Sequence, residues 1–200
     1  MRSRYWLFYA LTLMAGARRQ MFTVFAGFLM VEKFHYDAGA IALMLLFNGV
    51  VNMFFAPTIG RWIGHFGERK ALACEYVGLV IVFAAYAFCE SAMLAVLLYV
   101  LDNLFFTAAI AIRSYFQKIS DPADIASTSG VSFTINHLAA VFIPVLFGLL
   151  WMTSPAAVFI AGSAMAAVSL VLSVLIPETP TPQNPTILSR FRPAVAPAAE

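Results

Sequence analysis

Two adjacent arginines, Arg18 and Arg19, stand in the middle of a long apolar stretch near the start of the chain. An arginine at the centre of a bilayer costs about 2.5–3.5 kcal/mol on insertion scales, so such residues usually pair with another charge or bind a solute. Asp102 stands in a later apolar stretch, at nearly the same depth as Arg18. We therefore expect Asp102 to contact Arg18 or Arg19.

Two interpretations of these charges are open. Arg18 and Arg19 either form an anion or substrate site in a water-filled cavity, or pair structurally with Asp102. We favour the site, because charges inside a membrane are commonly functional. Successive helical residues point about 100° apart, so only one of the two arginines need face the cavity. Asp102 is equally a candidate for proton coupling and for simple charge compensation.

Four asparagines and one histidine accompany these charges in the apolar stretches. Asn48 and Asn52 lie one helical turn apart, and we favour a helix-bridging role for them over solute binding. For His137 we favour a hydrogen-bonded helix contact over a proton relay, since a lone histidine is weak evidence. The candidate cavity residues are Arg18, Arg19, Asn48, Asn52, Asp102, Asn103, Asn136 and His137.

The composition places most of this chain in lipid. Its 200 residues are 62% hydrophobic and 11% charged, with a mean hydropathy of +0.86. Soluble domains carry about 25% charged residues, so a soluble fold could not hide this much apolar surface. The net charge is only +2 and no basic run occurs, so we expect the lipid bilayer rather than nucleic acid as a partner.

Six apolar segments are long enough to cross a bilayer as helices, which need about 20 residues each. The sequence therefore predicts an all-α integral membrane domain over residues 1–176 and a disordered, proline-rich cytoplasmic tail over residues 177–200. Pro144 lies inside the fifth segment and predicts a bend there. The predicted spans are residues 6–31, 40–59, 71–88, 92–112, 125–151 and 156–176.

The lysines and arginines predict the orientation of these spans. Nine of them lie on the side of the membrane that holds the N-terminus, whereas Lys33 alone lies on the other side. The positive-inside rule then places both termini in the cytoplasm, and the pattern fits a bacterial inner membrane. The nine are Arg2, Arg4, Arg61, Arg69, Lys70, Arg113, Lys118, Arg190 and Arg192.

The polar residues divide the spans into two groups of three. The first, second, fourth and fifth spans carry central polar groups, whereas the third and sixth carry none of comparable strength. We place Glu75, in the third span, near the cytoplasmic end. This order predicts two three-helix repeats whose third helices face lipid, and such repeats are typical of transporters.

No pattern typical of an enzyme occurs in the sequence. It has no Cys/His cluster for zinc, no nucleophile elbow and no phosphate-binding loop. His137 is the only histidine within a span, which excludes bis-histidine haem ligation. We therefore expect no enzymatic activity, no metal site and no cofactor.

Residues 60–70, between the second and third spans, resemble the gating-loop signature of the major facilitator superfamily, G-x-x-x-D-R-x-G-R-R/K. The family's Asp is Gly64 here and the following Arg is His65, so the charge network that this Asp forms is not implied at this position. Pro144 in the fifth span is similar to the proline-rich helix at the same place in the family. The signature positions that match are Gly60, Gly67, Arg69 and Lys70.

The resemblance covers all six spans, whereas the family has twelve, so the chain resembles one six-helix half. A degenerate signature is commoner in the family's C-terminal half, which this chain therefore resembles more. The family's fold implies that the first and fourth helices line a central cavity, the second and fifth pack against the other half, and the third and sixth face outward. The expected partner is then a second six-helix half, either a separate chain or the other copy in a homodimer.

The function that this resemblance implies is secondary active transport by alternating access. The arginines would favour a small anionic solute, and Asp102 is the candidate for a coupling proton. The alternative is a non-transporting membrane module or scaffold that assembles with another membrane protein.

Overall fold

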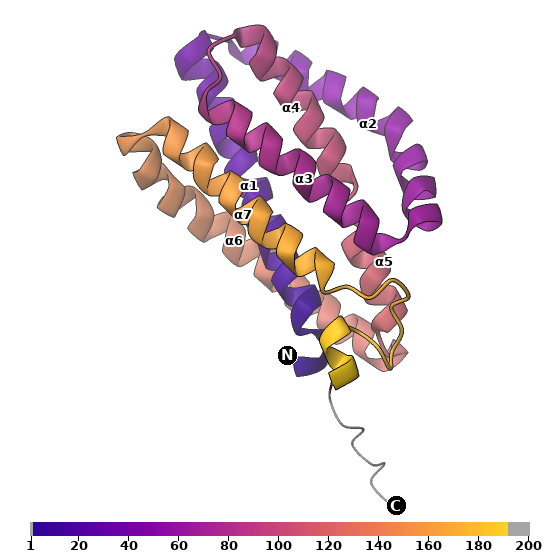
Figure 1. Ribbon diagram of the computed structural model, residues 1–200. Helices are drawn as coiled ribbons and strands as arrows, with labels where there is room; N and C mark the ends of the chain where they lie inside the picture. The colour runs from indigo at the N-terminus through magenta and orange to yellow at the C-terminus, as the bar shows by residue number, and fades with distance from the viewer. Residues whose placement is uncertain (1, 192–200) are drawn as a thin grey trace, which may run out of the picture.

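The computed structural model describes residues 2–191, which form a bundle of α-helices without a β-strand (Figure 1). Short 3₁₀ turns precede the first helix, join the fifth to the sixth, and follow the last. The α-helices are α1 (Trp6–Phe34), α2 (Ala38–Phe66), α3 (Glu68–Ala87), α4 (Ala92–Thr107), α5 (Ile110–Ile119), α6 (Ile125–Thr153) and α7 (Pro155–Val174).

Five segments of the described chain are long and apolar enough to cross a membrane: α2, α3, α4 together with α5, the stretch that contains α6, and α7. At 29 residues α1 is as long as α2, but it falls outside this group because Arg18, Arg19 and Gln20 interrupt its apolar sequence. The all-α membrane fold is thus confirmed, whereas the sixth span and the two repeats stay predictions.

The helix α2 continues to Phe66, beyond the end that Pro57 and Gly60 predicted. Pro57 removes one backbone hydrogen bond, but a chain in lipid must bond its remaining backbone groups internally, which favours continuing the helix. Gly67 alone joins α2 to α3, with φ of 86°. The predicted loop is therefore two helix ends joined by one glycine, a residue that adopts positive φ without a steric penalty.

The fourth predicted span is longer than expected and is interrupted. It reaches Ile119 as α4 and α5, with a break at Ala108 and Ala109. The amides of both alanines bond to carbonyl groups three residues back, at 2.9 and 3.0 Å. This is the tighter 3₁₀ geometry. Neither proline nor glycine stands at the break, so the sequence carries no signal for it.

The bundle is held by three sets of helix contacts. The helix α3 packs along α7, α1 packs along α6 and α7, and α4 packs along α2 and α3 (Figure 1). Gly78 permits one close approach, because a Cβ there would lie 2.4 Å from the ring of Phe105 in α4. Gly162 of α7 permits another, against Met21 of α1. Small residues at such crossings let helix backbones pack closely in lipid.

The helices α2 and α6 turn broad apolar faces outward. Only 6% of the most apolar stretch of α2 and 11% of that of α6 is buried in the bundle, against 50% for α3. The helix α3, which we expected to face lipid, therefore buries one side against α7 and exposes only the other. Exposed side chains on α2 and α6 include Leu43, Leu46, Met53, Phe54, Phe133, Val141, Val145 and Leu149.

The start of the chain and the segment after α7 lie at the same end of the bundle (Figure 1). In that segment, the Pro185 carbonyl accepts a hydrogen bond from the buried Tyr115 hydroxyl at 2.5 Å. The first part of the predicted tail thus contacts the bundle through Pro185. Residues 192–200 lie outside the described residues, and the domain boundary at residue 177 stays a prediction.

Candidate solute site

Arg18 lies in the interior of the bundle, between α1 and α3. Its side chain is 1% exposed, and its Nη2 lies 3.7 Å from Glu75 Oε1. Its guanidinium also lies over the ring of Tyr76, 4.7 Å from the ring centroid. At 3.7 Å the contact with Glu75 is an ion pair rather than a hydrogen bond. The pair neutralises a charge that neither lipid nor an apolar core would accept alone.

Glu75, rather than Asp102, is therefore the ion-pair partner of Arg18, and our placement of Glu75 near the cytoplasmic surface was wrong. Glu75 is 1% exposed. Asp102 is also buried, at 4% exposed, but no cation of the described chain lies within 4 Å of it. The charges of Arg18 and Arg19 act on Asp102 from a longer distance. Arg18, Glu75 and Asp102 thus form one buried cluster across α1, α3 and α4.

Arg19 points away from this interior. Its side chain is exposed, its guanidinium lies over the ring of Phe106 at 4.7 Å, and no acid within 4 Å pairs with it in the described part of the chain. The turn of about 100° between successive helical residues separates the two arginines. Arg18 is therefore satisfied inside the bundle, and Arg19 offers the available positive charge.

Two asparagines contribute differently to the contact of α2 with α4. Asn52 Oδ1 accepts a hydrogen bond from the Thr107 hydroxyl at 2.7 Å, which bridges the two helices. Asn48 is buried, and its amide nitrogen makes no hydrogen bond within the described residues. Asn103 donates to the Tyr99 carbonyl of its own helix. Of the two asparagines of α2, Asn52 makes a hydrogen bond to another helix, as the helix-bridging interpretation expects.

The two candidate residues of α6, Asn136 and His137, are both exposed. Asn136 donates to the Ser132 carbonyl, and His137 Nδ1 lies 3.0 Å from the Phe133 carbonyl one turn back. A Cβ at Gly16 of α1 would lie 2.4 Å from Asn136 Oδ1, so Asn136 packs directly against α1. The structure therefore places Asn136 beside α1 and leaves His137 on the outward face.

The signature residues lie where α2 meets α3, and along α3 Lys70 precedes Glu75 of the cluster by five residues. Gly60 and Gly64 belong to α2, and Arg69 and Lys70 to the first turn of α3. The structure adds one residue that the sequence analysis missed. Glu68, 2% exposed, accepts a hydrogen bond from Ser114 at 2.7 Å and pairs with Lys118 at 2.6 Å, which fastens α3 to α5.

A helical bundle with apolar outward faces and charged groups in its interior defines an integral membrane protein. The family profile described as Major Facilitator Superfamily matches residues 8–198. The chain belongs to this superfamily, whose members are membrane transporters rather than enzymes, and the resemblance seen in its sequence is confirmed. No curated protein and no solved structure matches the chain. Among the described residues, no group of three potential metal ligands is present.

Proposed function

We propose that this chain is a six-helix half of a secondary active transporter for a small anionic solute. The observation that carries the proposal is Arg19, an exposed guanidinium in the middle of α1 with no acid of the described chain within 4 Å. An arginine at this depth is costly unless it pairs with a charge. A negatively charged solute supplies that charge during transport.

Asp102 is the candidate for proton coupling in this proposal. It is buried in α4 with no cation of the described chain within 4 Å, and it responds to the charges of both arginines. A carboxyl group in this position exchanges a proton more readily than one held in a direct ion pair. Binding of an anion at Arg19 would remove a positive charge near Asp102 and so couple solute to proton.

Alternating access requires a second six-helix unit, and the outward apolar faces of α2 and α6 support its docking there. Both ends of the described chain lie at one end of the bundle, which supports six crossings with both termini in the cytoplasm. The nine cations on that side fit a bacterial inner membrane.

Transport by reconstituted protein tests the role of Arg19. The chain, purified together with the membrane protein that accompanies it, is placed in proteoliposomes and offered labelled carboxylates and phosphate esters. Arg19→Gln should lower uptake about tenfold or more, and Arg19→Lys should retain part of it, because the charge is kept. Arg113→Gln, a charge loss on the exposed side of α5, is the matched control. Uptake by Arg19→Gln at the rate of Arg113→Gln would refute the site.

Proton-driven uptake and solute exchange, measured separately, distinguish a role of Asp102 in proton coupling from a role in solute binding. Asp102→Asn should abolish the stimulation of uptake by an inward proton gradient, because the side chain then carries no exchangeable charge. Exchange of external for internal solute should continue, since it needs no net proton movement. Loss of both modes together would assign Asp102 to binding or folding instead.

The alternative function is a non-transporting scaffold that assembles with another membrane protein. Gly64 favours it, because this residue replaces the family's acidic gating group. A scaffold would bind its partner normally and show no solute flux that depends on Arg19. The same proteoliposomes therefore distinguish the two functions.

A further inference from the structure

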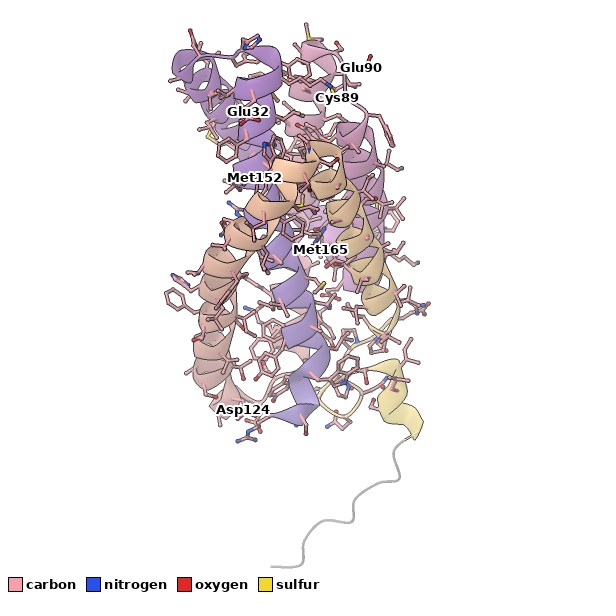
Figure 2. The ribbon with its side chains drawn as sticks, turned by 90° about the vertical axis from the view of Figure 1, so that its left-hand side faces the viewer. Glu32, Cys89, Glu90, Asp124, Met152 and Met165 are labelled. Atoms are coloured by element: carbon pink, nitrogen blue, oxygen red, sulfur yellow. The ribbon has the colours of Figure 1, made fainter. Side chains whose placement is uncertain are left out.

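A cavity of about 420 Å³ opens at the end of the bundle opposite the chain's start. Figure 2 shows Glu32, Cys89 and Glu90 at this end, with Asp124 at the other. The cavity lies between the last turns of α1, α3 and α6 and the first turn of α7. Its volume is that of a small-solute site. It contains none of the residues of the Arg19 site.

One wall of this cavity is negative. Glu32, near the end of α1, accepts a hydrogen bond from Trp151 Nε1 of α6 at 3.0 Å through its Oε2. Its Oε1 makes no hydrogen bond within the described residues. The indole thus holds the carboxylate toward α6 and leaves one oxygen available to a ligand.

The other wall is positive. Lys33 donates to the Cys89 carbonyl, in the turn between α3 and α4, at 2.7 Å. An ammonium group has three N–H donors, so two are left for a ligand. Glu32 and Lys33 form no ion pair with each other, because their partners draw them to different helices.

Aromatic rings form the floor between these walls. Tyr86 and Phe159 stack with centroids 5.0 Å apart, and Trp151 meets Phe159 edge-on at 6.1 Å. Tyr86 and Phe159 are almost fully buried, so Trp151, which is partly exposed, is the ring available to a ligand. An aromatic ring next to a carboxylate favours an organic ammonium group. Rings that are already packed against one another lose little freedom when a ligand arrives.

We propose that this cavity binds a small zwitterion, with its ammonium group at Glu32 and the aromatic floor and its acidic group at Lys33. Charges of opposite sign, one held toward α6 and the other toward the turn between α3 and α4, distinguish such a ligand from a simple amine or a simple anion. A free zwitterionic solute and the headgroup of a zwitterionic lipid share this chemistry. The site stands independently of transport, since it needs neither Arg19 nor a second half.

The protein contains its own reporter of binding at this cavity. It has three tryptophans, and Trp6→Phe with Trp62→Phe leaves Trp151 as the only one. Glycerophosphoethanolamine, which carries both charges, should change the fluorescence of Trp151 saturably. Ethanolamine, which carries only the positive charge, and glycerophosphate, which carries only negative charge, should bind about tenfold more weakly or worse. Equal binding of ethanolamine would overturn the proposal.

Variants test the two walls separately, with binding measured by equilibrium dialysis so that no indole signal is needed. Glu32→Gln and Lys33→Met should each weaken binding of glycerophosphoethanolamine about tenfold or more, because each leaves one ligand charge unpaired. Glu90→Gln is the matched control, an exposed acid at the same end that does not line the cavity. If either Glu32→Gln or Lys33→Met binds the probe with the affinity of Glu90→Gln, the proposed zwitterion site is wrong.

A lipid competition identifies the source of the ligand. The protein is placed in nanodiscs of phosphatidylethanolamine or of phosphatidylglycerol, and the soluble probe is titrated into both. Weaker apparent binding in phosphatidylethanolamine supports a lipid headgroup in the cavity, and equal binding supports a free solute. Binding in neither preparation would overturn the proposal for both sources.

Discussion

Arg18 places a guanidinium inside the bundle, where Glu75 is the only acid of the described chain within 4 Å. Removal of one partner of a buried pair leaves the other charge uncompensated, at a cost of about 3–5 kcal/mol. Glu75→Leu should therefore lower the free energy of unfolding by that amount. Denaturant titration of the purified protein in detergent micelles, followed by helical circular dichroism, measures the loss.

A double variant separates the ion pair from the shape of the site. Arg18→Met with Glu75→Leu removes both charges together, and apolar replacement of a whole buried pair is often neutral or stabilising. It should therefore recover most of the stability that Glu75→Leu alone loses. Glu90→Gln, an exposed acid, should unfold like the wild type. Equal stability of Glu75→Leu and Glu90→Gln would mean that the pair contributes nothing to the fold.

The sequence predicted that a buried arginine needs an acid but not which acid supplies it. Depth follows from counting residues, whereas direction around the helix follows from packing. Glu75 was misplaced because we began the third span at Ala71, whereas α3 begins at Glu68. From that start Glu75 lies two turns, about 10 Å, inside the helix. The correct boundary would have made it a candidate.

At the scale of the helix, Gly78 fixes how closely α3 meets α4. A Cβ at this position would overlap the ring of Phe105, so either that ring or one of the two helices must move. Overpacking of this kind costs about 1–3 kcal/mol. Gly78→Ala should lower the midpoint of thermal unfolding, measured by a thiol-reactive or light-scattering assay in detergent.

Gly27 of α1 is the matched control, since nothing lies within 4 Å of the position of its Cβ. Gly27→Ala adds the same methyl group without a clash and raises helix propensity by about 0.5–1 kcal/mol. It should leave the midpoint unchanged or raise it. A Gly78→Ala protein as stable as Gly27→Ala would show that the Phe105 ring moves aside at no cost.

The helices themselves were predictable to different degrees. Apolar length located every long helix, and Pro144 does lie inside α6 as predicted. The break between α4 and α5 was not predictable, because an alanine pair has no local tendency to end a helix. It adjoins Thr107, whose hydroxyl bonds to Asn52 of α2. This hydrogen bond joins two different helices, so it forms only in the folded bundle and cannot be read from the local sequence.

At the scale of the whole molecule, the helix contacts stay the same when the first three spans are exchanged with the last three, so that α1 corresponds to α4, α2 to α6 and α3 to α7. The packing of α1 on α6 and α7 corresponds to the packing of α4 on α2 and α3. The contact between α3 and α7 is unchanged by the exchange, because each of these helices takes the other's place. Two related three-helix units would produce this pattern, which supports the proposed repeats. It leaves α2 and α6 in equivalent, outward positions.

Those two outward helices are where a second six-helix unit should bind. In a protein with Cys74 and Cys89 replaced by serine, Met53→Cys on α2 or Val145→Cys on α6 is labelled with benzophenone maleimide and illuminated in native membranes, and each should form cross-links to a partner. The photoactivated ketone inserts into C–H bonds, so the partner needs no cysteine. Val171→Cys on α7 is the control, because its side chain is 66% exposed, against 65% for Met53 and 63% for Val145. A lipid-facing Val171→Cys should form no cross-link to protein, since no partner would lie near it. A cross-linked band at twice the mass of the chain would identify a homodimer, and any other mass a separate partner chain. Equal cross-linking at all three positions, or at none, would contradict docking through α2 and α6.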